Sequence, residues 1–427
     1  MNTSRSAVLL SGTTLAAAVM AANVVNLFFN AYLGRVISAE DFGVLALINT
    51  FMYFGSLFYN AVSGITNREV SFLDNSVTSE AGTLFFLSLT KQILLVNLVL
   101  SVIWTLAVPA LTQFFHLTDT TILYLFAPLF LFYPLAFLGR GYLQGKLFFI
   151  LVGVSIFIEP VIKFVSAFWL LSGGYHQLIY QSIYISAIVT GIVTFILAWQ
   201  NKSVVTKKSS YPFPFTFFGA ALLAGVSTIS FLALDMILVK HFLAPDQAGQ
   251  YAYLSLVGKI VFFAGSLLNV FTISVVASQS KKTKNPQLSF YLLFTGSLLL
   301  VLGAVLIFGV FGFFSIPLLL TDKASLIIPY ALPYLSAIAL FTLGNTIVTY
   351  HLALKQYVFA IVSLLMALSL IAGIYLNHQS VSQIVNVLLM VSIFYSLILG
   401  SLHIRQNFFN PAVSARRMQK LSEEVVS

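Results

Sequence analysis

Residues 33–46 read LGRVISAEDFGVLA, and residues 239–252 read VKHFLAPDQAGQYA. Each stretch joins the end of one long apolar segment to the start of the next through a short polar turn. Glu40 aligns with Asp246, and an acid in the first turn of a helix interacts favourably with the helix dipole. The two stretches therefore indicate a duplicated helix–turn–helix unit.

A second pair of stretches supports the duplication. Residues 141–146 read GYLQGK before one apolar segment, and residues 350–355 read YHLALK before another. Their separation along the chain is nearly the same as that between the first pair, in which Gly43 aligns with Gly249. Two matches at one spacing are better explained by an internal repeat than by chance likeness between membrane loops.

The turn residues also predict where helices begin. Ser38 is suited to the N-cap of the helix that follows the first turn, because its hydroxyl can accept a hydrogen bond from a backbone N–H that has no partner within the helix. Pro245 is suited to the first helical position after the second turn, where its missing N–H costs nothing.

The composition of the whole chain indicates a membrane protein. Of 427 residues, 59% are hydrophobic and 8% are charged, whereas soluble domains carry about 25% charged residues. Such a chain has too few polar side chains to cover a water-facing surface, so its outer face must contact lipid. We attribute the net charge of +9 to basic cytoplasmic loops and expect no nucleic-acid partner, because no basic stretch accompanies a soluble domain.

The apolar segments predict an all-α polytopic membrane protein with about twelve transmembrane helices, since a span needs about 20 mainly apolar residues. Six spans in each half give the halves the same orientation, with a substrate path between them, as in transporters. The predicted domains are an N-terminal six-helix lobe at 1–200, a cytoplasmic linker at 201–213, a C-terminal six-helix lobe at 214–405 and a cytoplasmic tail at 406–427. The predicted spans are 7–34, 41–66, 83–110, 121–142, 148–171, 178–200, 214–242, 248–278, 288–320, 325–350, 354–376 and 383–404.

The distribution of Lys and Arg among the short loops predicts the orientation, because such residues concentrate on the cytoplasmic side. With both termini in the cytoplasm, most of the 21 basic residues fall on that side, Arg68 and Arg140 among them. The outer side then holds only Arg35, Lys240 and Lys323, while Lys163 and Lys259 lie within spans.

The sequence also resembles a known family. Residues 33–43, 64–69 (GITNRE) and 141–145 (GYLQG) resemble loop motifs of polysaccharide flippases, the Wzx-like branch of the multidrug/oligosaccharidyl-lipid/polysaccharide exporter superfamily. Asp235 followed by residues 244–251 (APDQAGQY) resembles the start of the second half in that family.

The resemblance implies a fold and a function. It implies two six-helix bundles around a central cavity that opens alternately to each side. It also implies that a lipid-diphosphate-linked oligosaccharide, an O-antigen unit for example, moves from the cytoplasmic to the outer leaflet of a bacterial or archaeal cytoplasmic membrane. Membrane lipids, and a polysaccharide polymerase or glycosyltransferases of the same biosynthesis, are the implied partners.

Ionisable residues inside spans are candidates for function, because burying them in a membrane is costly. Glu159 and Lys163 lie four residues apart on one helix face. Asp235 and Lys259 lie at similar depths on helices expected to be adjacent. Each pair is either a neutralised structural pair or a part of the transport path. In the second case the lysines bind a diphosphate and the acids Glu159 and Asp235 carry a coupling ion, H+ or Na+.

Three further features bear on the site. Arg35 is a candidate substrate ligand, because the four intramembrane charges sum to zero and an anionic substrate needs additional cations such as Arg35, Arg68 or Arg140. Asn26 belongs to a polar stripe in the first span and either bonds a neighbouring helix or faces a saccharide. His351 lies near the predicted cytoplasmic end of a span and is expected to anchor it at the interface.

The sequence argues against an enzyme. No Gly-rich phosphate loop, zinc-protease motif or metal-ligand spacing occurs in it, and the chain has no cysteine for thiol chemistry. No cofactor is therefore expected other than the coupling ion. A cation-coupled exporter of drugs or metabolites on the same fold is the nearest alternative. A membrane-embedded polysaccharide polymerase is an alternative of another class, although such enzymes usually carry a large outer loop.

Overall fold

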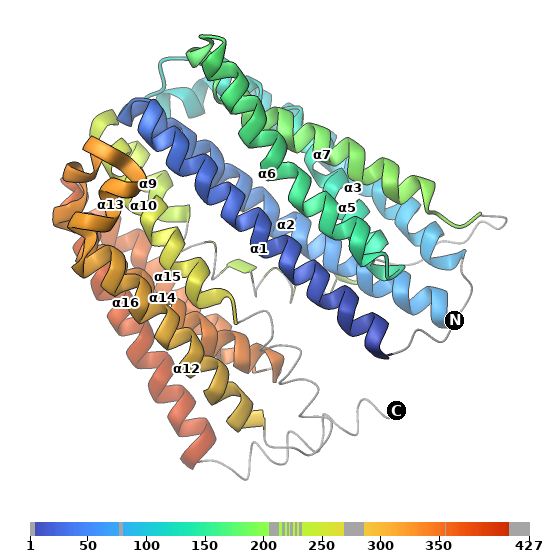
Figure 1. Cartoon of the computed structure of the whole chain (residues 1–427). Helices are drawn as coiled ribbons and strands as arrows, with labels where there is room; N and C mark the ends of the chain where they lie inside the picture. The colour runs from blue at the N-terminus through green and yellow to red at the C-terminus, as the bar shows by residue number, and fades with distance from the viewer. Residues whose placement is uncertain are drawn as a thin grey trace. The chain divides into compact units, whose positions relative to one another are not determined.

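The computed structural model is almost entirely helical (Figure 1). It describes residues 5–76, 80–204 and 213–409, with the exception of 216–217, 220–221, 223–224, 227–228, 230–232, 269–285 and 355. Residues 410–427 of the predicted cytoplasmic tail and most of the predicted linker lie outside the described residues.

The chain forms two compact units. The first contains residues 1–33 and 51–222, and the second contains residues 34–50 and 223–427. The turn at residues 34–41 therefore packs with the second half of the chain, although we assigned it to the N-terminal lobe. Whether the two predicted lobes act as separate bodies stays a prediction.

The first half of the chain supplies the helices α1 to α7. Their bounds are α1 (Arg5–Val36), α2 (Ala39–Ser76), α3 (Ala81–Phe114), α4 (Thr121–Tyr124), α5 (Leu129–Gly145), α6 (Phe149–Ser172), the short η1 (His176–Leu178) and α7 (Gln181–Gln200). The predicted fourth span is thus a short helix, α4, followed by a longer one, α5.

The second half repeats this series. Its elements are α9 (Asp235–Phe242), α10 (Pro245–Ser266), α12 (Pro286–Val305), the π-helical turn η3 (Leu306–Val310), α13 (Gly312–Leu320), η4 (Thr321–Leu326), α14 (Ile328–Ala353), α15 (Val358–Leu376), α16 (Val381–Ile404) and η5 (Arg405–Phe409). Parts of the predicted seventh and eighth spans lie outside the described residues.

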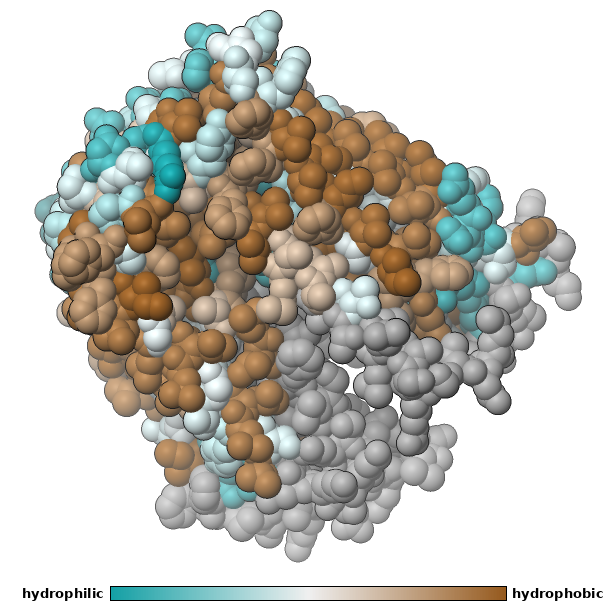
Figure 2. Space-filling view, in the orientation of Figure 1, coloured by the Kyte–Doolittle hydropathy of each residue, from teal (hydrophilic) through white to brown (hydrophobic). Residues whose placement is uncertain are grey.

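The helices have the length and composition of membrane spans. Within the described residues, nine helices are long and apolar enough to cross a membrane. Few residues are buried in the most apolar stretches of α3 and α12, whereas most of that stretch of α14 is buried. On the face seen in Figure 2, hydrophobic side chains cover the helices over most of their length, and hydrophilic residues gather near helix ends. The prediction of an all-α multi-pass membrane protein is confirmed.

Helix packing within each unit follows the predicted repeat. In the first unit α5 packs on α7, α3 packs on α5, and α6 packs on α7. In the second unit the corresponding pairs are α14 on α16, α12 on α14, and α15 on α16. The same neighbours in the same order show that the two halves are built alike.

The predicted helix starts are confirmed at both turns. The Ser38 hydroxyl accepts a hydrogen bond from the Asp41 N–H at 3.0 Å and donates one to the Asp41 carboxylate at 2.6 Å. The helix α10 begins at Pro245. Both residues satisfy or remove backbone groups that a helix start would leave without partners.

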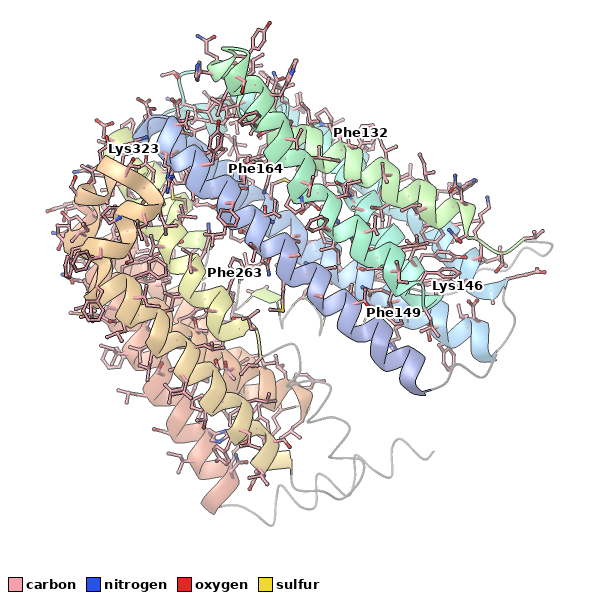
Figure 3. All side chains as sticks on the ribbon, viewed as in Figure 1. Phe132, Lys146, Phe149, Phe164, Phe263 and Lys323 are labelled. Carbon is pink, nitrogen blue, oxygen red and sulfur yellow. The ribbon has the colours of Figure 1, made fainter. Side chains whose placement is uncertain are left out.

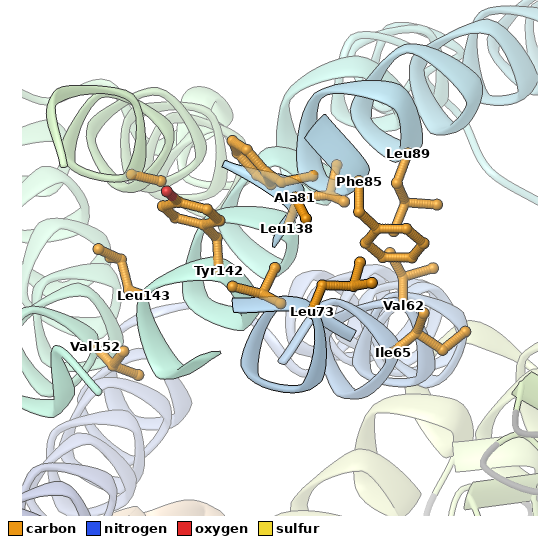
Figure 4. Packing of buried hydrophobic residues seen from close by; sticks show 13 residues of the cluster. Val62, Ile65, Leu73, Ala81, Phe85, Leu89, Leu138, Tyr142, Leu143 and Val152 are labelled. Atoms are coloured by element: carbon orange, nitrogen blue, oxygen red, sulfur yellow. The ribbon is translucent and has the colours of Figure 1, made fainter. Parts of the chain in front are cut away.

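A dense apolar core holds one end of the first unit (Figure 4), and polar contacts surround it. Tyr142 is fully buried there, and its hydroxyl is 2.9 Å from that of Thr83. The Lys146 ammonium lies 2.5 Å from the Asp74 carboxylate and donates to the Ser203 hydroxyl at 3.1 Å. The motif at 141–145 thus forms a structural junction between α2, α3 and α5.

Candidate functional site

The charges inside the first unit centre on Arg140 of α5. Its Nη2 lies 3.0 Å from the Glu159 carboxylate and donates to the Ser155 carbonyl at 2.8 Å, both on α6. Its Nε donates to the Ser155 hydroxyl at 3.2 Å. The two charged side chains are 11% and 24% exposed, so this is a largely buried ion pair with additional hydrogen bonds.

Arg140 changes the predicted pairing in this unit. One of our two interpretations paired Glu159 with Lys163, and we placed Arg140 on the cytoplasmic side. Instead, α5 continues to Gly145, and Arg140 lies inside the helical unit against Glu159. Two cations, Arg140 and Lys163, then accompany Glu159, so these three charges sum to +1.

Lys163 faces the first helix. Its ammonium lies 4.7 Å from the centre of the Phe29 ring on α1, within the range of a cation–π interaction. Asn26 shares a helix face with Phe29 by its spacing. The Asn26 side-chain oxygen is buried and accepts no hydrogen bond within the described residues. The amide of Asn30, by contrast, donates to the Asn26 backbone carbonyl at 2.7 Å.

In the second unit the central charged residue is Asp235, at the start of α9. It is 1% exposed, and its carboxylate accepts hydrogen bonds from the Tyr251 hydroxyl at 2.6 Å and the Met236 N–H at 2.8 Å. Lys259 of α10 is close enough to attract this carboxylate electrostatically. This attraction agrees with the expected placement of Asp235 and Lys259 on adjacent helices, and Tyr251 is an additional partner of Asp235.

Arg35 does not face these charges. Its Nε donates to the Leu319 carbonyl at 2.7 Å, and its Nη2 donates to the Leu318 carbonyl. Both carbonyls belong to the last turn of α13, where a helix has no internal N–H to satisfy them. In this structure the guanidinium of Arg35 is therefore engaged by a helix end of the second unit.

His351 is part of a buried network rather than an interface anchor. It is fully buried, with Nδ1 2.5 Å from the Gln356 side-chain oxygen and Nε2 2.9 Å from His403 Nδ1. The Tyr291 hydroxyl lies 3.1 Å from His403 Nε2. With both imidazoles neutral, one consistent set of donors and acceptors runs from Tyr291 to Gln356.

No residue of these clusters forms a metal centre. Among the described residues, no three His, Asp or Glu side chains are grouped closely enough to hold a metal ion. The coupling ion proposed from the sequence, H+ or Na+, is a question for transport measurements.

Comparison with known proteins places this geometry in context. No family model matches the chain, and no curated protein sequence matches it. Solved structures do. A structure titled "Lipid II flippase MurJ, inward closed conformation" matches 96% of this chain and 89% of its own, with a TM-score of 0.69 and 15% identity. The chain shares the fold of this flippase.

Multidrug exporters share the same fold. An inward-facing multidrug resistance MATE family transporter of the MOP superfamily matches 90% of this chain and 94% of its own, with a TM-score of 0.69 and 12% identity. A structure of the MATE multidrug transporter DinF-BH matches 94% of both chains, with a TM-score of 0.61 and 15% identity. These likenesses are of fold, so the substrate must be argued from the residues.

Proposed function

We propose that this protein is a flippase that moves a lipid-diphosphate-linked oligosaccharide from the cytoplasmic to the outer leaflet of the cytoplasmic membrane by alternating access. The observation that carries the proposal is the buried Arg140–Glu159 ion pair in the same unit as Lys163. Because Arg140 engages the carboxylate, Arg140, Glu159 and Lys163 together carry a charge of +1, which suits a diphosphate.

The surroundings of Lys163 suit the two parts of such a substrate. A lysine ammonium binds phosphate as a point charge. The buried side-chain oxygen of Asn26, one helical turn from Phe29, is an acceptor suited to a sugar hydroxyl. Asn26 and Lys163 thus remain the candidate substrate ligands of the first unit, with Lys259 as the candidate of the second.

A cation-coupled exporter of drugs or metabolites is the second candidate function. The observation that favours it is Asp235, a buried carboxylate held by the Tyr251 hydroxyl, since a buried acid inside a membrane is suited to carry a proton or sodium ion. The two functions share one coupling site and differ in the charge of the substrate.

Reconstituted vesicles test the proposal. Purified protein in liposomes that contain a fluorescent polyprenyl-diphosphate-linked saccharide should move the lipid between leaflets, as measured by the fraction accessible to an external quencher. Lys163→Met should slow this movement roughly tenfold or more, because hydrogen bonds to charged groups contribute about 1.5–3 kcal/mol. Lys163→Arg should retain more activity, because it keeps the charge.

The chain offers a matched control in Lys202, whose ammonium also lies over an aromatic ring, that of Trp199, at 3.2 Å from its centre. Lys202→Met should transport at the wild-type rate. Movement of a cationic dye instead of the lipid, with loss on Asp235→Asn, would favour the exporter. No movement of the saccharide lipid by wild-type protein would overturn the flippase proposal.

A further inference from the structure

The three basic residues that we predicted on the outer side meet at one place in the second unit. Arg35 lies on the last turn of α1, Lys240 on the last turn of α9, and Lys323 on η4. Figure 3 shows Lys323 beside the end of α1. They are also the three exceptions to the predicted cytoplasmic bias of basic residues, so their positions call for a physical explanation.

Arg35 and Lys323 cap each other's helix. Arg35 donates to the Leu318 and Leu319 carbonyls at the end of α13. Lys323, just after α13, donates to the Gly34 carbonyl at 3.0 Å and to the Ile37 carbonyl at the end of α1. Both helix ends carry partial negative charge, and a cation on each neutralises it.

The backbone conformation at the end of α13 suits these reciprocal caps. Thr321 has a φ of +53°, a left-handed conformation that ends a helix abruptly and is rare for a residue other than glycine. It leaves the last carbonyls of α13 facing Arg35 and starts the turn that brings Lys323 back to α1. Burial lowers the pKa of the Lys323 ammonium, and the carboxylates of Asp322 and Asp41 partly offset this effect.

Close packing accompanies the caps. The Phe42 and Tyr253 rings stack with centroids 4.6 Å apart. A Cβ atom at Gly34 would lie 2.8 Å from a Leu320 methyl, so glycine lets the two segments approach without moving the Leu320 side chain. Lys240 is 2% exposed and is attracted by the carboxylates of Glu40 and Asp41.

We infer that residues 34–50 form a latch: the first turn of the N-terminal half is held on the C-terminal half by the reciprocal caps of Arg35 and Lys323, and transport requires its release. Arg35 then acts as a positioning residue of the latch rather than as a ligand of the substrate diphosphate. The need for release during transport rests on the proposed alternating-access function, but the holding role of the two caps does not.

Thiol labelling tests the holding role without any substrate. The chain has no cysteine, so Ile37→Cys introduces a single thiol at a position that is 6% exposed. A membrane-impermeant maleimide should label it slowly in the otherwise unchanged protein. The additional changes Arg35→Gln and Lys323→Gln should each raise the labelling rate roughly tenfold. Arg68→Gln, which removes a largely exposed charge, is the matched control and should leave the rate unchanged. Equal rates in all four proteins would overturn the latch.

A reversible cross-link tests the need for release. Gly34→Cys together with Leu320→Cys places two thiols at the closest contact of the latch. Oxidation should reduce transport to background and a reductant should restore it, while either single variant transports under both conditions. Full transport by quantitatively cross-linked protein would overturn the need for release. If wild-type protein does not move the saccharide lipid, the flippase proposal fails, and the labelling result still decides the holding role.

Discussion

Gly43 and Gly249, which occupy equivalent positions in the two halves of the sequence, pack backbone against backbone. A Cβ atom at Gly43 would lie 3.2 Å from the Gly249 nitrogen, and one at Gly249 would lie 2.1 Å from the Ala39 carbonyl oxygen. The two members of the internal repeat therefore touch each other at the start of α2 and α10. Glycine is required there by the approach of the two backbones.

This contact predicts the effect of adding one methyl group. Gly249→Ala should lower the free energy of unfolding by about 1–3 kcal/mol, because overpacking in a tight interface costs that much. Gly43→Ala should cost less, since its nearest neighbour is farther away. Thermal unfolding in detergent measures both. Gly303→Ala, which has no atom within 4 Å of the added Cβ, should be neutral or slightly stabilising; a loss as large as that of Gly249→Ala would contradict the explanation.

The ion pair in the first unit predicts non-additive effects. Arg140→Gln should destabilise the protein more than Glu159→Gln, because Arg140 also donates to the Ser155 carbonyl and hydroxyl. The double variant should lose less stability than the two single losses together, because each single change leaves a largely buried charge without its counter-ion. A cycle of unfolding measurements gives the coupling, which we expect to be about 1–3 kcal/mol. Strict additivity would show that the pair does not contribute as a pair.

Substitutions of Asp235 and Lys163 should affect transport without affecting folding. Replacing either residue by Ala should abolish transport while the protein still inserts and elutes as a folded species. Tyr251→Phe removes the hydroxyl that donates to Asp235 at 2.6 Å and should reduce transport without abolishing it. Tyr357→Phe, at a half-exposed ring, is its control. Full complementation of a flippase-deficient strain by Asp235→Ala and Lys163→Ala would refute their roles, and loss of folded protein would assign them to structure.

The hydrogen-bonded pair of His351 and His403 predicts an effect on the stability of the second unit. His403→Ala should destabilise the packing of α14 on α16 by about 1–3 kcal/mol, because it leaves the buried His351 Nε2 without its partner. Thermal unfolding measures the loss. His176→Ala, at an exposed position, should unfold like the wild type, and similar behaviour of both variants would exclude a stabilising network.

Local patterns predicted most of the fold. The repeated turns, the apolar segments, the Ser38 cap and the Pro245 helix start depend on neighbouring residues only, and each has its counterpart in the structure. The pairing of Arg140 with Glu159 was missed because Arg140 lies close to the predicted end of a span, and α5 continues past it to Gly145. A shift of one helical turn in the predicted end of the span decides whether such a side chain faces water or the interior of the helical unit.

The partners of the site residues were harder to predict. Tyr251 could have been found, because Asp235 and Tyr251 lie equally far from Leu243 on two helices joined by a tight turn. The position of Arg35 on the end of α13 could not, because the two segments lie far apart along the chain and meet only through tertiary packing. The helical repeat predicts which residues of one helix share a face. Contacts between helices that are far apart in the sequence depend instead on how the whole protein packs.

The division of the chain into units has a mechanical consequence. The helix α1 passes from the first unit to the second between Leu33 and Gly34, and α2 returns from the second to the first between Thr50 and Phe51. Neither helix is interrupted there. Because both helices are continuous, any strain that passes along the chain from one unit to the other is carried by α1 and α2.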